Sequence, residues 1–92
     1  MSNLFLFFTN KTAATSSWVA DDTYTKYPYV SNIACSAVTA NYYPEVVFNL
    51  DDAVSGYFAP ICESVANGVK IWASDVPVAN VVIPTIKCTK AG

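Results

Sequence analysis

The sequence predicts a mainly β fold, a small antiparallel β-sandwich or curled sheet of five to six strands with one short α-helix near residues 60–66. Three observations support this class. β-Branched and aromatic residues cluster in short runs with alternating side-chain character. Asn, Asp, Gly and Pro residues that favour turns separate these runs. Helical spacing occurs in only one segment, and 92 residues are enough for one domain.

The last two runs are the clearest strand candidates. Residues 69–77 and 81–89 flank a turn that contains Pro77 and Asn80, and we predict that they form an antiparallel pair at the end of the domain. Pro84 cannot donate a ladder hydrogen bond. The second run is therefore expected to be an edge strand, or to be bulged at this proline.

Alternation divides the side chains of residues 69–75 between two faces. The inward face is predicted to carry Val69, Ile71 and Ala73. The opposite face is predicted to carry Lys70, Trp72 and Ser74. Trp72 would then be exposed on a lone subunit, and its burial or exposure would distinguish assembly from recognition.

Three earlier segments also read as strands. A short strand begins at Trp18. Within residues 27–38 the odd positions form one apolar face, which consists of Tyr27, Tyr29, Ile33 and Cys35. In residues 45–50, alternation predicts that Val46, Phe48 and Leu50 face the core.

The helical segment is predicted at residues 60–66. Pro60 suits a first helical position. Ile61 and Val65 have the i, i+4 spacing of one helix face, and Asn67-Gly68 resembles a C-terminal cap. Such a short helix would be held by packing against the sheet.

The first part of the chain is unusually apolar. Residues 1–12 are predicted to form a hydrophobic attachment strand, and residues 13–92 a single β-rich domain. The candidate oligomerisation or attachment residues are Leu4, Phe5, Leu6, Phe7 and Phe8. This run is far shorter than the roughly 20 residues that span a bilayer, so no membrane insertion is expected. An exposed strand of this kind would aggregate, which favours burial in an oligomer.

The composition favours an interacting protein. Hydrophobic residues make up 53% and charged residues 13%, whereas about 25% charged is typical. Exposed apolar area is therefore expected, and such area usually marks a subunit interface or a binding surface. With a net charge of −2, five Lys and no Arg, the chain has no basic stripe for nucleic acid.

Catalysis is not expected. The chain has no His, which removes the commonest general base and metal ligand. The aspartate pairs Asp21/Asp22 and Asp51/Asp52 read as solvated turn formers. Calcium binding by one of these loops stays open, although neither has the spacing of a dedicated calcium loop. No cofactor or metal is predicted.

The cysteines Cys35, Cys62 and Cys88 lack the close spacing of zinc ligands. We interpret them as thiols buried as small hydrophobes in a reducing compartment. One disulfide with a free thiol is the alternative.

Tyr and Trp side chains, which combine an apolar ring with a polar tip, are the strongest functional signal. The candidates for surface recognition or for an interface are Trp72, Tyr42, Tyr43, Tyr57 and Tyr24. One interpretation places them in the core and a subunit interface. The other makes them a platform for sugar rings or a protein receptor, beside Asn41, Asp22 or Asp75. A monomeric carbohydrate-binding module is therefore an alternative function.

Several motifs share their order and spacing with a known family. They include Trp18-Val19-Ala20-Asp21, Tyr27-Pro28-Tyr29, Pro44-Glu45-Val46-Val47-Phe48, Ser55-Gly56-Tyr57-Phe58-Ala59-Pro60, Val69-Lys70-Ile71-Trp72-Ala73 and Val82-Ile83-Pro84-Thr85-Ile86. Over residues 10–89 the chain resembles the C-terminal domain of tail or head fibre proteins from bacteriophages and prophages of Firmicutes.

This resemblance implies a non-enzymatic bacteriophage structural protein, a fibre or capsid-decoration domain of the virion that is assembled in the cytoplasm of the bacterial host. It implies a homotrimer that contacts other virion proteins and contributes to attachment to a glycan or protein of the host surface. The chain begins only a few residues before the matched region. A free-standing virion component, a short capsid fibre and a piece of a longer fibre are all compatible with that start.

Overall fold

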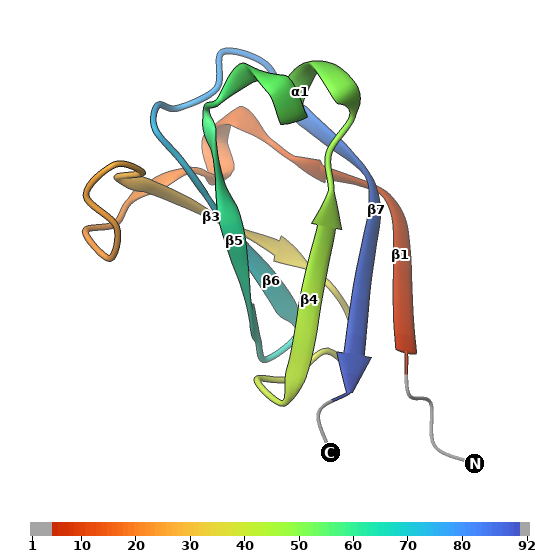
Figure 1. Cartoon of the computed structure of the whole chain (residues 1–92). Helices are drawn as coiled ribbons and strands as arrows, with labels where there is room; N and C mark the ends of the chain where they lie inside the picture. The colour runs from red at the N-terminus through yellow and green to blue at the C-terminus, as the bar shows by residue number, and fades with distance from the viewer. Residues whose placement is uncertain (1–4, 91–92) are drawn as a thin grey trace.

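The computed structural model describes residues 5–90, which form two antiparallel β-sheets packed face to face (Figure 1). The three-stranded sheet has the order β1 (Phe5–Ala13), β7 (Val81–Lys90), β4 (Tyr42–Val47). The four-stranded sheet has the order β2 (Val19–Ala20), β3 (Tyr29–Ala34), β6 (Gly68–Ala73), β5 (Phe58–Val65). A 3-10 turn, η1 (Thr15–Ser17), and one short helix, α1 (Leu50–Ser55), complete the described elements. The predicted mainly β class is confirmed, with seven strands instead of five or six.

The main core lies between the two sheets. From β7 it receives Ile83, Ile86 and Cys88, and from β6 it receives Val69 and Ile71, all almost completely buried. The predicted inward face of residues 69–73 is therefore confirmed. Ile33 and Cys35 join the same core from β3 and the residue after it, and Tyr29 packs against it, as the alternation predicted. Tyr27, which was predicted on the same face, packs instead with Val30 and Trp72 outside this core.

The predicted pairing of the last two strands is wrong. β6 pairs with β3 and β5, whereas β7 pairs with β1 and β4. The loop of residues 74–80 carries the chain from one sheet to the other (Figure 1). Each of these two strands directs one apolar face toward the core between the sheets. Their side chains therefore alternate in the same way as those of two paired strands in a hairpin.

β7 is the central strand of its sheet, so the edge position predicted from Pro84 is also wrong. No bulge forms there either, because the register of β1 and β7 is the same on both sides of Asn10 and Pro84, and only the pair between these two residues is absent. Asn10 has a positive φ of 53°. The alternation changes phase at this point, and Ile83 and Ile86 are both buried although they are three residues apart.

No helix forms at residues 60–66, where the prediction is wrong. This segment belongs to β5, and Cys62, Glu63, Ser64 and Val65 pair with β6. The feature read as a helix cap is the turn between β5 and β6, where Asn67 has a φ of 57°. A left-handed residue serves helix ends and hairpin turns equally well, so this cue does not distinguish them.

The helix lies ten residues earlier, at α1. The side chain of Asn49 caps its start by accepting a hydrogen bond of 3.1 Å from the backbone N–H of Asp52. Asp51 and Asp52 lie in its first turn, where the helix dipole favours negative charge. Gly56, with a φ of 77°, ends it. Leu50 is exposed instead of facing the core, so that prediction is wrong.

A second, smaller cluster covers the outer face of the four-stranded sheet. Val30, Ala59 and Trp72 are buried there beneath Tyr24 and Tyr27 from the loop between β2 and β3. Trp72 does lie on the face opposite Ile71, as alternation predicted. Its predicted exposure is wrong, because only 2% of its surface is accessible.

Ala37 carries local backbone strain. Its φ of 72° lies in the left-handed region, which costs an L-residue with a Cβ about 1–2 kcal/mol. Its side chain is exposed, so a substitution loses little packing. We expect Ala37→Gly to raise the free energy of unfolding by about 0.5–1 kcal/mol, because the larger freedom of glycine in the unfolded chain offsets part of the relief. Urea denaturation tests this, and a less stable variant would contradict it.

Candidate functional site

The outer face of the three-stranded sheet has no covering layer among residues 5–90, unlike the outer face of the four-stranded sheet. Its exposed apolar residues are Phe5, Phe7, Tyr43, Val47 and Val82. We call this set the outer patch. Phe7 and Tyr43 expose 63% and 68% of their surface, so large aromatic rings face solvent on this side of the sheet. Such a surface is typical of an interface.

Strand register brings the outer patch together. β7 places Lys87 opposite Phe7 of β1 on one side and opposite Glu45 of β4 on the other. One step along, Thr89 lies between Phe5 and Tyr43 in the same way. The Lys87 ammonium lies 4.8 Å from the centroid of the Phe5 ring and 6.0 Å from that of Phe7. The ammonium group thus lies within cation–π distance of both rings, which strand alternation places on the outer face.

The edge of β1 extends this surface. β1 is the end strand of its sheet, and its outer edge has no strand partner in the described part of the chain. It runs for nine residues without a proline. An unpaired strand with exposed aromatic side chains is a template for pairing with another chain. Residues 5–9 and 11–13 pair with β7 in the same sheet, and Leu4 lies outside the described residues.

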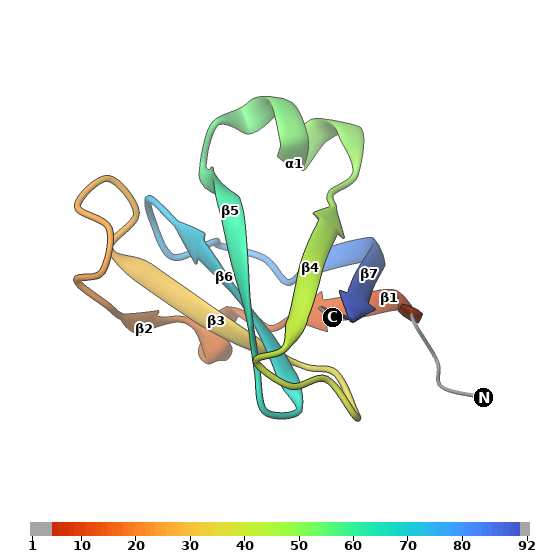
Figure 2. The same ribbon diagram turned by 60° about the horizontal axis from the view of Figure 1, so that its bottom comes forward.

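The facing edges of β4 and β5 are protected against such pairing. The two strands lie close together at one end and diverge toward α1 (Figure 2). At the narrow end, side chains replace a backbone ladder, because Ser64 Oγ donates to the Tyr42 carbonyl and Cys62 Sγ donates to the Pro44 carbonyl over 3.5 Å. Pro44 and Pro60 also remove an N–H donor from each strand.

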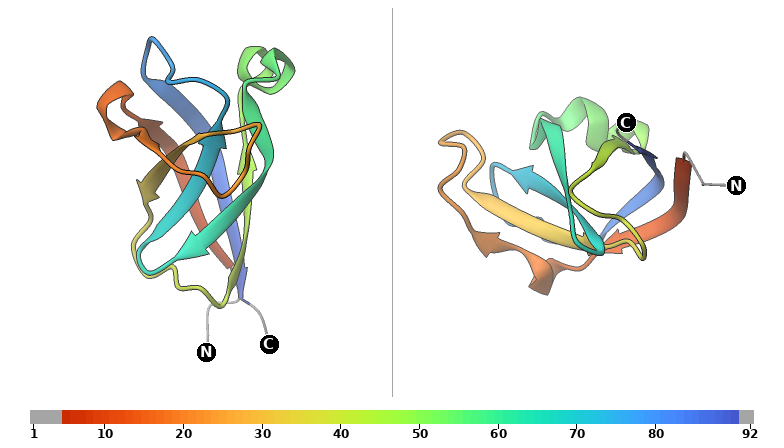
Figure 3. Two further views of the ribbon diagram at one scale, coloured as in Figure 1. Left: turned by 90° about the vertical axis from the view of Figure 1, so that its left-hand side faces the viewer. Right: turned by 90° about the horizontal axis from the view of Figure 1, so that it is seen from below.

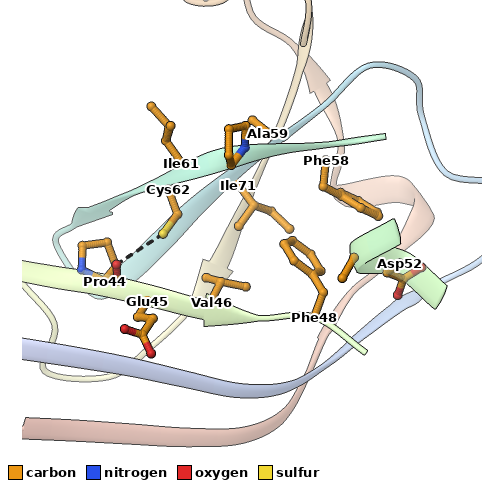
Figure 4. A pocket seen from close by; sticks show the side chains of 12 residues that line it. Pro44, Glu45, Val46, Phe48, Asp52, Phe58, Ala59, Ile61, Cys62 and Ile71 are labelled. Carbon is orange, nitrogen blue, oxygen red and sulfur yellow. Dashed lines mark hydrogen bonds between the residues drawn. The ribbon is translucent and has the colours of Figure 1, made fainter. Parts of the chain in front are cut away.

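At the wide end these edges enclose a cleft of about 300 Å³. Figure 4 shows Val46, Ile71 and the rings of Phe48 and Phe58 around it, and these rings stack at 4.7 Å. Glu45 and Asp52 also line it. The Cys62 thiol lines it as well and donates to the Pro44 carbonyl. Within residues 5–90, no three His, Cys, Asp or Glu side chains are grouped so as to hold a metal ion.

The three cysteines are free thiols near the core. Cys35 and Cys88 are buried, and Cys62 is partly buried. Burial raises the pKa of Cys88 to about 11, with smaller contributions from the neighbouring Cys35 and Cys62 thiols. Burial is likewise the main cause of the raised pKa values of Cys35 and Cys62. A protonated thiol is a poor nucleophile and a poor metal ligand.

A pH dependence of stability follows from the Cys88 thiol. An unfolded chain ionises this thiol near its ordinary pKa of about 8.5, whereas the folded chain keeps it protonated up to about pH 11. Its contribution to the free energy of unfolding is therefore complete below about pH 8.5 and falls as the pH rises toward 11. Urea denaturation across this interval should show a shallower decline for Cys88→Ala than for the unmodified chain. Equal slopes would contradict the assignment.

The structure separates the predicted aromatic candidates. Tyr43 is in the outer patch, whereas Tyr42 packs against the main core. Trp72 is buried, and Tyr24 packs edge-on against it with the ring centroids 5.1 Å apart. Tyr57 is exposed directly after α1, away from the outer patch. These residues therefore do not form one aromatic platform.

The N-terminal candidates also divide between two faces. Phe5 and Phe7 belong to the outer patch, and Leu6 and Phe8 pack against the main core. The sequence interpretation did not single out Val47, Val82 or Lys87 for this surface. Alternation alone could have placed Val47 outward from Val46, but Lys87 joins the patch through pairing with a strand 80 positions earlier in the chain.

The aspartate pairs occupy turn and helix positions. Asp21 accepts a 2.8 Å hydrogen bond from the Thr23 backbone N–H. Hydrogen bonds from the Thr23 side chain and backbone are the main causes that lower the pKa of Asp21, followed by smaller effects of Trp72 and Lys70. Asp51 and Asp52 lie in the first turn of α1. Asp21 thus accepts a hydrogen bond within a turn, and Asp51 and Asp52 lie at the start of a helix, so these residues have local structural roles.

Fold and site define a small antiparallel β-sandwich with one uncovered aromatic face. The sequence matches no family model, no curated protein and no solved structure. No helix in the described residues is long and apolar enough to cross a membrane.

Proposed function

We propose that this chain is a non-enzymatic structural protein of a bacteriophage, a fibre or capsid-decoration domain that assembles as a homotrimer. The observation that carries the proposal is the outer patch together with the unpaired edge of β1. In this proposal the two features are the subunit interface, and the protein is located in the virion.

The contrast between the two sheets supports an interface on the outer patch. The outer aromatic residue of the four-stranded sheet, Trp72, is covered by the chain's own loop, whereas no part of residues 5–90 covers Phe5 and Phe7 in this way. Obligate interfaces resemble a domain core divided in two. A second copy would give these rings the cover that Tyr24 and Tyr27 give Trp72.

Charge and symmetry are compatible with a closed assembly. Only 13% of the residues are charged, and Lys87 and Glu45, which lie within the proposed interface, have opposite signs and occupy paired positions. A heterologous contact, in which the edge of β1 meets a different surface of the next copy, closes into a ring when the rotation is 120°. The bacteriophage class and the trimer come from the family resemblance of residues 10–89. In that class the domain would contact other virion proteins and the host surface.

Size measurement in solution tests the assembly. Light scattering coupled to size-exclusion chromatography at micromolar concentration should give about 30 kDa, three times the 9.9 kDa of one chain. A 9.9 kDa species that persists at high concentration would overturn the homotrimer. The genes adjacent to this one are expected to encode capsid and tail proteins, and an unrelated neighbourhood would contradict the bacteriophage class.

A further inference from the structure

A hollow of about 450 Å³ lies between the end of α1 and the loop of residues 74–80. The left-hand view of Figure 3 places α1 and this loop at the same end of the sandwich, opposite the start of β1 and the end of β7. Tyr57 and Asp75, which are 18 positions apart in the sequence, both line the hollow. It is therefore separate from the outer patch.

A left-handed glycine and two hydrogen bonds fix the backbone at Tyr57. Gly56, with a φ of 77°, turns the chain out of α1. The Tyr57 N–H donates to Ser55 Oγ over 3.2 Å, and the Tyr57 carbonyl accepts from the Ser74 N–H over 2.8 Å. Both backbone groups are thus held while 59% of the residue stays accessible. The backbone that carries the ring is therefore already ordered before a ligand binds, which lowers the entropic cost of binding.

The polar groups of the hollow are hydrogen-bond acceptors and one amide. Asp52 and Asp75 contribute carboxylates. Asn80 uses its Oδ1 atom to accept a 3.0 Å hydrogen bond from the Thr15 N–H, which leaves its NH₂ group as a donor. Val76 and Val78 add apolar walls. A few convergent polar groups around an apolar ring are typical of small-ligand sites.

Charge restricts the ligand class. None of the five Lys residues lines the hollow, and two carboxylates do. Anionic ligands such as phosphates and uronic acids are therefore disfavoured. A pyranose ring offers an apolar C–H face for Tyr57 and hydroxyl donors for both aspartates. An amino sugar adds an ammonium group with the complementary charge.

We infer that this hollow binds a neutral or amino-sugar ring of a surface glycan, with Tyr57 as the stacking platform and Asp52 and Asp75 as hydroxyl and ammonium acceptors. The inference rests on the proposed role in host attachment, for which it names the ligand class and the site.

Isothermal titration with defined tetrasaccharides tests the site. The probes are a glucosamine tetramer, an N-acetylglucosamine tetramer and, as the anionic comparison, a galacturonic acid tetramer. We expect the first two to bind and the third not to bind. Tyr57→Ala should weaken binding about ten-fold, which corresponds to the loss of one aromatic stacking contact. Tyr57→Phe keeps the ring and should retain most of the affinity.

Two further variants separate this site from the outer patch. Asp75→Asn should weaken glucosamine binding more than N-acetylglucosamine binding, because it removes a charge. Tyr43→Ala changes an equally exposed tyrosine in the outer patch and should leave sugar binding unchanged. A monomeric protein that binds through Tyr57 would overturn the trimer and support the sugar site. Failure of both glucosamine-type probes to bind the trimer, or binding unaffected by Tyr57→Ala and Asp75→Asn, would overturn the sugar site alone.

Discussion

Trp72→Ala is expected to lower the free energy of unfolding by about 3–5 kcal/mol, the range for truncation of a large buried aromatic residue. Trp72 is 2% exposed and packs with Val30 and Ala59 beneath the Tyr24 ring. Alanine would leave a void, and the small outer cluster around Trp72 has few side chains that could fill it. Because small domains are stable by only about 5–15 kcal/mol, this loss would be a large part of the total.

Urea denaturation monitored by circular dichroism measures the effect of Trp72→Ala. Tyr43→Ala is the matched control, because its exposed ring should contribute less than about 0.5 kcal/mol to the stability of the subunit. The comparison is made below the concentration at which the subunits associate. Equal small losses in both variants would mean that Trp72 is exposed in solution.

Phe7→Ser is expected to weaken self-association by at least ten-fold without unfolding the subunit. Phe7 exposes 63% of its surface on the edge strand β1, beside Lys87 of the central strand β7. If the edge of β1 is the contact, Phe7 becomes buried in it, and aromatic residues buried in an interface commonly contribute about 2 kcal/mol or more to binding. The same ring contributes little to the core, where Leu6 and Phe8 point.

Light scattering over a dilution series measures this change as a shift in the concentration at which the assembly dissociates. Val54→Ser is the control, since Val54 is similarly exposed but lies on α1. The interface assignment would be wrong if Phe7→Ser dissociated at the same concentration as the unmodified chain, or if Val54→Ser had the larger effect.

Local patterns predicted the inner faces of the strands well. The alternation of Ile33 and Cys35, and that of Val69 and Ile71, matches the observed core. Period-two alternation is set by backbone geometry, so it survives whichever strand lies alongside. The helix was predicted at residues 60–66 instead of at Leu50–Ser55, because Asn67 has the same left-handed backbone as Gly56. The N-cap residue Asn49 is the feature of the sequence that marks the observed start.

The surface was harder to predict than the core. Trp72 and Phe7 each lie on the outer face of a sheet. Alternation predicts this face for Trp72, but the run from Leu4 to Phe8 is apolar at every position and predicts no outer face for Phe7. A loop covers Trp72 and leaves Phe7 uncovered. That difference depends on where residues 21–28 fold back, which alternation does not encode. Tyr57 and Asp75 likewise meet only because β5 and β6 are neighbours in one sheet.

The sequence by itself determined the β class, the apolar faces and the excess of apolar over charged residues. These properties depend on each residue and its near neighbours. Only the tertiary structure decided that β6 and β7 belong to different sheets, that Trp72 is buried and that Phe5, Phe7 and Tyr43 share one uncovered face. The physical reason is that pairing and covering are contacts between distant segments. Their choice depends on burying the apolar surface of the whole chain at once.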